Sequence, residues 1–157
     1  MKVLGIDPGS GIIGFGLVKK GRNPSMGDAG VIRTTIGDPT ASRLLELYES
    51  MKEVIELTKP DVSAVEKLFF AQNVTTAMTV SQARGVILLA LEEAKIPIYE
   101  YTPLQIKMAM TGYGRATKAQ LQEMVRVQLK LKKKPTPDDA ADALAVALTH
   151  IATLQVS

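Results

Sequence analysis

Four carboxylates, Asp7, Glu66, Asp139 and Asp142, stand where the chain could bring them together. Asp7 and Glu66 each follow a short apolar run, and Asp139 and Asp142 are three residues apart in an apolar segment near the end of the chain. Clustered carboxylates repel one another and stay ionised together only when a cation holds them. Oxygen-only ligands favour Mg²⁺ or Mn²⁺. Two such ions about 4 Å apart stabilise the attacking and leaving oxygens of phosphoryl transfer, so the set predicts a metal-dependent nuclease.

Two strands and a helix must position these acids. The strand Val3–Asp7 delivers Asp7 to a Pro8-Gly9 turn. The strand Val62–Val65, which ends in Glu66, follows a helix, so a right-handed crossover makes it parallel to the first strand. The carboxyl ends of parallel neighbours meet at one edge of a sheet. Residues three apart share a helix face, so the last helix can add Asp139 and Asp142 there, and the adjacent Asp138 is a further candidate.

The remaining pattern predicts an α/β fold with a five-stranded mixed sheet, whose first three strands are antiparallel, and helices on both faces. The short turn after Asp7 makes the first two strands a hairpin. We expect one domain over residues 1–157. The other expected elements are strands Ile12–Lys19, Ala29–Ile36 and Ile96–Tyr101, and helices Thr40–Thr58, Val74–Lys95, Pro103–Met110, Lys118–Leu131 and about Asp138–Leu154.

Composition narrows the class of protein. The chain has 157 residues, 46% apolar and 22% charged, which is ordinary for a globular protein. It contains no cysteine, which excludes disulfides and cysteine-based zinc sites. We expect no apolar stretch to reach the roughly 20 residues of a membrane span and no signal peptide before the first strand. These expectations favour a cytoplasmic protein.

A basic stretch lies between Tyr101 and Pro137, where Glu123 is the one acid. The net charge of the chain is only +3, so the stretch stands against a more acidic remainder. Such segregation favours a polyanionic partner, although a solvated helix face with a lysine loop would give the same pattern. The stretch contains Lys107, Arg115, Lys118, Arg126, Lys130, Lys132, Lys133 and Lys134.

Each acid also has an ordinary structural interpretation. Asp7 fits a plain Pro-Gly turn, Glu66 fits the edge of a loop, and Asp138 and Asp139 fit the first turn of a helix, where the dipole favours acids. Asp142 is harder to explain in this way, because it lies inside an otherwise apolar helix and needs a partner there.

Several motifs, in this order, resemble the RuvC family of bacterial Holliday-junction resolvases, members of the RNase H-like superfamily. The resemblance runs nearly from end to end. Its motifs are Gly5-Ile6-Asp7-Pro8-Gly9, Glu66 with Phe69 and Ala71-Gln72-Asn73, Gln82-Ala83-Arg84-Gly85, and Asp139-Ala140-Ala141-Asp142-Ala143-Leu144-Ala145.

The resemblance implies a homodimer that binds four-way DNA junctions and nicks two strands of like polarity symmetrically, with Mg²⁺ or Mn²⁺. It implies 5′-phosphate and 3′-hydroxyl ends, a thymine-containing cleavage sequence, and the branch-migration motor RuvAB as a partner. The family's acidic tetrad matches Asp7, Glu66, Asp139 and Asp142.

The resemblance also implies roles for residues outside the tetrad. Two catalytic lysines of the family match Lys107 and Lys118, which could stabilise the charge of the scissile phosphate. The family's base-stacking aromatic matches Phe69, and Phe70 is an equal candidate. Tyr113 and Arg115, in a glycine-containing break, could contact the DNA backbone. For Phe69 and Phe70 the alternative is core packing. For Tyr113 and Arg115 it is an ordinary turn between helices.

Three other functions remain open on the sequence. An actin-like ATPase or sugar kinase also begins with a phosphate-binding hairpin, although this chain is short for its duplicated architecture. A junction-binding module would use the acids only as caps and turns. A related RNase H-like nuclease would act on RNA or on other branched DNA.

Overall fold

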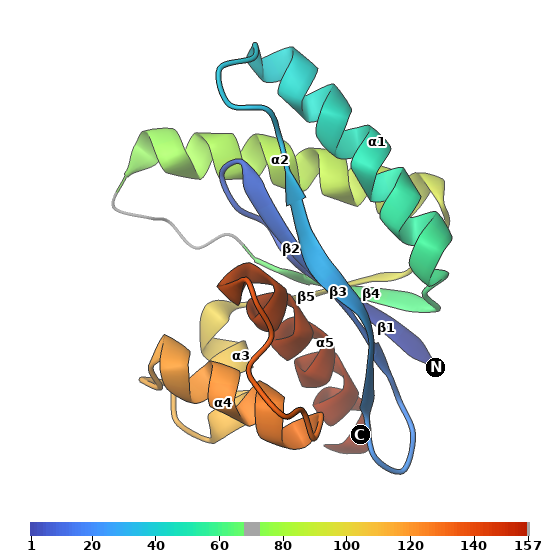
Figure 1. The fold of residues 1–157 in the computed structure, drawn as a ribbon, viewed down its shortest axis with the longest axis vertical. Helices are drawn as coiled ribbons and strands as arrows, with labels where there is room; N and C mark the ends of the chain where they lie inside the picture. The colour runs from blue at the N-terminus through green and yellow to red at the C-terminus, as the bar shows by residue number, and fades with distance from the viewer. Residues whose placement is uncertain (68–72, 157) are drawn as a thin grey trace.

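The computed structural model describes residues 1–67 and 73–156, which form one five-stranded sheet with helices on both faces (Figure 1). The strand order is β3-β2-β1-β4-β5. The elements are β1 (Lys2–Asp7), β2 (Ile12–Lys19), β3 (Ser25–Arg33), α1 (Thr40–Thr58), β4 (Val62–Glu66), α2 (Val74–Glu93), β5 (Ile98–Tyr101), α3 (Pro103–Thr111), α4 (Lys118–Gln128) and α5 (Asp138–Val156).

The central strand β1 sets the geometry of the sheet edge. It pairs antiparallel with β2, where Asp7 lies opposite Gly14. On its other side it pairs parallel with β4, where Ile6 lies opposite Val65. Asp7 and Glu66, the next residues along these two strands, therefore come to the same edge, as the sequence predicts.

Two apolar cores lie on opposite faces of the sheet, and the alternation of β1 residues feeds both. Val3 points into the core beneath α3, α4 and α5. Leu4 and Ile6 point into the core beneath α1 and α2. By the same alternation Asp7 lies on the α5 face, as Val3 and Gly5 do.

Helix α5 packs very close to the sheet because glycines face it. A Cβ atom built on Gly5 would lie 2.0 Å from the Ala143 carbonyl oxygen, and one built on Gly14 would lie 1.9 Å from the Asp139 carbonyl oxygen. A Cβ atom built on Gly16 would lie 2.6 Å from Cγ of Leu144. No larger residue fits at these positions without moving the helix.

The predicted fold class is confirmed, and the boundaries of the third strand are wrong at both ends. We expect Ala29–Ile36, whereas β3 starts at Ser25, which pairs with Lys19, and stops at Arg33. A register shift between Gly16 and Val18 accommodates this longer hairpin. Ile36 is 90% exposed, outside the sheet, despite its β-branched side chain. Helix α2 and strand β5 are each about two residues shorter than expected.

The expectation that no apolar stretch is long enough to span a bilayer is also wrong, because one helix meets the criteria of length and composition. Helix α2 has 20 residues and a mean hydropathy of 1.4 over its most apolar window. Of that window 33% is buried within the protein, and Ile87 and Leu91 belong to the core above the sheet. Core helices of water-soluble proteins have the same length and composition, so α2 alone does not indicate a membrane protein.

We expect Gly5→Ala to destabilise the protein by about 3 kcal/mol, because the added methyl group would overlap the α5 backbone. The matched control is Gly85→Ala in α2, where a Cβ meets nothing within 4 Å. This control should stabilise the helix by about 0.5–1 kcal/mol. Urea unfolding measures both. Equal free energies of unfolding for the two variants would contradict the proposed close packing.

Candidate active site

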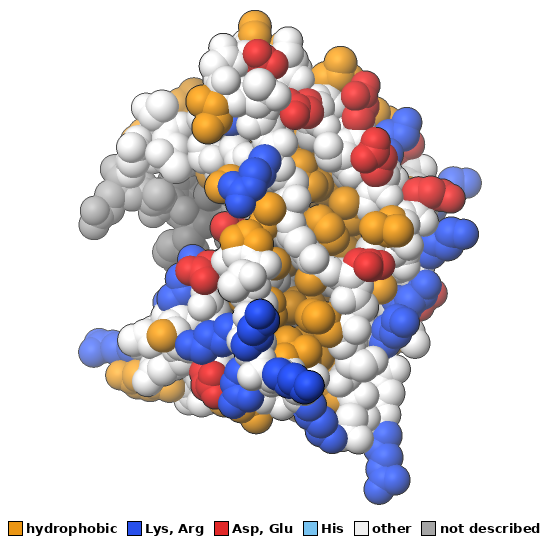
Figure 2. Space-filling view, viewed as in Figure 1, with side chains coloured by type: hydrophobic (Ala, Val, Ile, Leu, Met, Phe, Trp, Pro, Cys, Tyr) orange, Lys and Arg blue, Asp and Glu red, His pale blue; other side chains and the backbone are white. Residues whose placement is uncertain are grey.

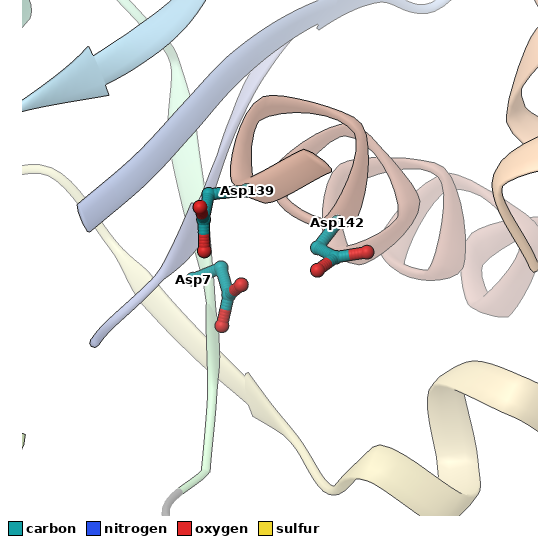
Figure 3. A group of neighbouring side chains, drawn as sticks. All are labelled: Asp7, Asp139 and Asp142. Carbon is teal, nitrogen blue, oxygen red and sulfur yellow. The ribbon is translucent and has the colours of Figure 1, made fainter. Parts of the chain in front are cut away.

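Three aspartates form a compact group at the sheet edge (Figure 3). Asp7 comes from the end of β1, and Asp139 and Asp142 come from the first turns of α5. One carboxylate oxygen from each lies within 4.8 Å of the others. Figure 3 shows the three side chains directed toward a common space between the strand and the helix.

The fourth predicted acid, Glu66, joins the group through Asp7. The two side chains share a hydrogen bond. Glu66 also lines, with Asp7 and Asp142, a cavity of about 360 Å³. The structure therefore brings all four predicted acids to one place.

Two lysines from the α3–α4 hairpin face these acids. The Lys118 Nζ atom lies 3.1 Å from Asp142 Oδ2. Lys107 and Lys118 line the same cavity as the acids. Asp142 thus has the partner that its position on an apolar helix requires.

Capping boxes start the two helices that carry these lysines. In each, a threonine side chain accepts from the backbone N–H three residues on, and a glutamine side chain accepts from the threonine N–H. Thr102 and Gln105 form the box of α3, and Thr117 and Gln120 form that of α4. Lys118 is the residue after the cap of α4, so the capping box fixes where its side chain begins.

Without a bound cation, the ionised form of these buried carboxylates is unfavourable. Burial, the hydrogen bond to Glu66 and the charges of the other acids raise the pKa of Asp7 to about 9. Burial likewise raises the pKa of Glu66 and of Asp142. The hydrogen bond to Asp142 raises the pKa of Lys118, which keeps this lysine charged. The raised pKa values mean that the carboxylates take up protons, because the nearby lysines do not balance all of their negative charge.

These residues fit a divalent cation. The donor set is oxygen-only, three of its atoms lie within reach of one ion, and the raised pKa of Asp7 shows that positive charge is favoured there. The donor set therefore indicates a divalent metal ion.

Other predicted residues lie apart from the acid cavity. Asp138 is exposed and outside the aspartate group, so Asp139 is the member of the pair that joins it. Tyr113 is 56% exposed and lines a separate cavity of about 450 Å³ between α3 and α4, and Arg115 is exposed nearby. Phe69 and Phe70 lie outside the described residues.

Gln122 is a site residue that the sequence analysis missed. Its Nε2 atom donates to Asp142 Oδ1 at 3.4 Å, and the residue is buried. It lies four residues after Lys118, on the same face of α4, and that spacing was the available signal. A glutamine without a known partner gives no other sign of its role.

We expect Asp7→Asn to stabilise the metal-free protein, by on the order of 2 kcal/mol at pH 8. The folded-state pKa of Asp7 is raised, so the folded wild type binds a proton that the unfolded chain releases above pH about 4. Wild-type stability should therefore fall between about pH 4 and pH 9, and Asp7→Asn should remove much of that fall.

Urea unfolding in EDTA at pH 5 and pH 8 measures this difference. Asp138→Asn is the matched control, because it removes an exposed acid next to the cluster. A stabilisation by Asp7→Asn that is the same at both pH values would contradict the electrostatic explanation.

Comparisons with known proteins agree over almost the whole chain. The family model described as crossover junction endodeoxyribonuclease RuvC matches residues 3–150. The RuvC of Petrotoga mobilis is 58% identical over 151 residues, covering 96% of this chain and 93% of that protein. The RuvC of Brevibacillus brevis is 54% identical and covers 96% and 91%.

Solved structures give the same result. The Thermus thermophilus RuvC structure has a TM-score of 0.90 and 38% identity, covering 99% of this chain and 96% of that one. A second T. thermophilus RuvC structure, in complex with a Holliday junction substrate, has a TM-score of 0.90 and 35% identity, covering 100% and 96%. Yeast mitochondrial Ydc2, at 14% identity, 96% and 77% coverage and a TM-score of 0.71, shares the fold. The chain belongs to the RuvC family of crossover junction endodeoxyribonucleases.

Proposed function

We propose that this protein resolves four-way DNA (Holliday) junctions by paired, symmetric nicks in strands of like polarity, in homologous recombination and DNA repair. The observation that carries the proposal is one cavity in which Asp7, Glu66 and Asp142 face Lys107 and Lys118, in a chain of this family. The ATPase and sugar-kinase alternative loses its support, because the family model covers residues 3–150.

Asp7, Glu66, Asp139 and Asp142 would hold the metal, Mg²⁺ or Mn²⁺, with two ions in each site. When bound, the metal supplies activation of a water molecule and charge stabilisation at the departing 3′ oxygen, which leaves a 5′-phosphate. Asp7 lies between Glu66 and the two aspartates of α5 and orients both halves of the ligand set.

The lysines would act on the phosphate. Lys118, held by Asp142 at 3.1 Å, and Lys107 present cations at the wall of the cavity, where negative charge increases in the transition state. Gln122, by donating to Asp142, fixes the orientation of the same carboxylate. These contacts exist before DNA binds, so little reorganisation is needed during the reaction.

The surface charge favours DNA on the side of α3 and α4. In Figure 2 most of the Lys and Arg side chains of this face lie over its lower half, where Figure 1 places α3, α4 and the β2–β3 turn, and others lie along its right edge beside α1. The Asp and Glu side chains lie mostly over α1. Tyr113 and Arg115 would contact the DNA backbone from this basic side, and Phe69 or Phe70 would stack on a base near the crossover.

We further propose that the protein is a cytoplasmic homodimer that works with the RuvAB branch-migration complex. Val74, Met78 and Leu89 on α2 are 70%, 62% and 59% exposed, so this helix offers apolar side chains that a second copy of the chain could cover. A two-fold junction that is cut twice requires two equivalent active sites.

A synthetic mobile junction with Mg²⁺ tests the central proposal. Wild type should produce symmetric paired nicks, whereas Asp7→Asn should cut at least about a thousandfold more slowly while binding the junction with nearly unchanged affinity, because it removes a metal ligand and no DNA contact. Gel analysis of labelled strands and a binding titration measure the two effects. Cutting of plain duplex at the same rate, or an Asp7→Asn variant as active as wild type, would rule the proposal out.

The dimer has its own test. Met78→Asp together with Leu89→Asp should convert a particle of two chains into single chains, because each exposed apolar side chain becomes charged at the interface. Light scattering gives the mass. The matched control is Leu57→Asp, which changes an exposed leucine on α1 and should leave the mass of two chains. A single-chain wild type in both the free and the junction-bound state would refute the dimer.

A further inference from the structure

A second, smaller cavity opens on the other face of the same sheet edge, between α1 and α2. It has a volume of about 50 Å³. Its lining includes Arg43 of α1, Gly11 of the β1–β2 connection, Thr34 after β3, and Gln82 of α2. Arg43 belongs to none of the motifs that carry the family resemblance, and it does not line the acid cavity.

The guanidinium group of Arg43 is anchored but has donors to spare. Its Nε atom donates to Thr34 Oγ1 at 3.0 Å. Within residues 1–67 and 73–156, no ion pair joins Arg43 to a carboxylate. Arginine has five N–H donors, so the Nη groups remain available. The acid one turn further on, Glu46, accepts instead from the backbone N–H and the hydroxyl of Thr35, at 2.9 Å and 3.2 Å.

The lining of this cavity suits a phosphate group. Its polar part presents the Arg43 guanidinium, the hydroxyls of Thr34 and Thr40 and the amide of Gln82, and the lining includes no Asp or Glu. The rest of the lining is mostly apolar and includes Ile13, Leu44, Leu47 and Ala83. Its volume admits a few water-sized groups, which is enough for the outer oxygens of one phosphate and too small for a nucleoside. Arginine binds phosphate through two parallel hydrogen bonds, so an anchored guanidinium with free Nη groups is a ready acceptor site.

Gly11 connects the Arg43 pocket to the strand that carries Asp7. It lies four residues after Asp7, in the β1–β2 connection, and its carbonyl accepts from the Thr34 N–H at 3.1 Å. A Cβ atom on Gly11 would lie 2.7 Å from Arg43 Nη2, so its backbone touches the guanidinium. A DNA strand that runs from the aspartates over this turn would pass the pocket.

We propose that the Arg43 pocket binds one backbone phosphate of the junction, on the strand that is cut and close to the cut site. This inference rests on the proposed function. It adds a phosphate contact on the α1–α2 face, whereas the lysines of the acid cavity lie on the opposite face. The contact would fix the register of the strand over the aspartates.

The test combines Arg43→Gln with junctions in which one phosphate near the cut is replaced by an uncharged methylphosphonate. Binding is measured in EDTA, so that metal-dependent cutting does not interfere. Wild type should lose about tenfold in affinity for one methylphosphonate position, and Arg43→Gln should lose about as much for the unmodified junction but nothing further at that position. The matched control is Lys52→Gln, an exposed cation on the same helix, which should behave as wild type.

The outcomes separate a phosphate contact from a structural role. Losses that simply add at every position would mean that Arg43 acts only through the fold, and would overturn the proposal. If Arg43→Gln does not fold, Arg43→Lys provides the same comparison, with a smaller but still position-specific effect. If methylphosphonates have no effect while inorganic phosphate raises the Tm of wild type and not of the Arg43 variant, the pocket takes free phosphate and the backbone assignment is wrong. Failure of wild type to bind any junction would instead refute the proposed function.

Discussion

The close contact between α5 and the glycine-containing strands β1 and β2 is the constraint on which the active site depends. Gly5 and Gly14 leave no room for a side chain between the sheet and the backbone of the helix. Because the helix backbone touches the strands, Asp139 and Asp142 reach the carboxylate of Asp7 at the end of β1. A larger residue at either glycine would push the helix away from the strands and so separate these acids.

This packing concentrates negative charge that the protein only partly neutralises. Lys118 and Gln122 satisfy Asp142, and a hydrogen bond to Glu66 satisfies Asp7. The raised pKa of Asp7 shows that part of the negative charge has no positive charge opposite it. A site that a divalent cation would stabilise, and that is unfavourable without it, couples metal binding to the stability of the whole sheet edge.

The same edge presents different chemistry on its two faces. On the α5 face, carboxylates and lysines line a cavity of about 360 Å³, and on the α1–α2 face, Arg43 and hydroxyl groups line one of about 50 Å³. The β1–β2 connection lies between them and contains both Pro8-Gly9 and Gly11. A short turn with small residues lets one polymer approach both faces, which is a geometric requirement for an enzyme that acts on a strand rather than on a small molecule.

The sequence by itself determined the element order, the mixed sheet and the four acids, because strand alternation, helical spacing and the Asp-Pro-Gly turn are local signals. It did not determine the limits of β3, where pairing of Ser25 with Lys19 extends the strand against the turn-forming composition of its start. It named Asp139 and kept Asp138 as a further candidate, and the rotation of α5 about its own axis is what places Asp139 in the aspartate group. The spacing of Gln122 from Lys118 was the one sequence signal for that residue, and Arg43 had none. Their contacts came from the tertiary structure, because a neutral amide and a helical arginine acquire their meaning from the residues that face them across the fold.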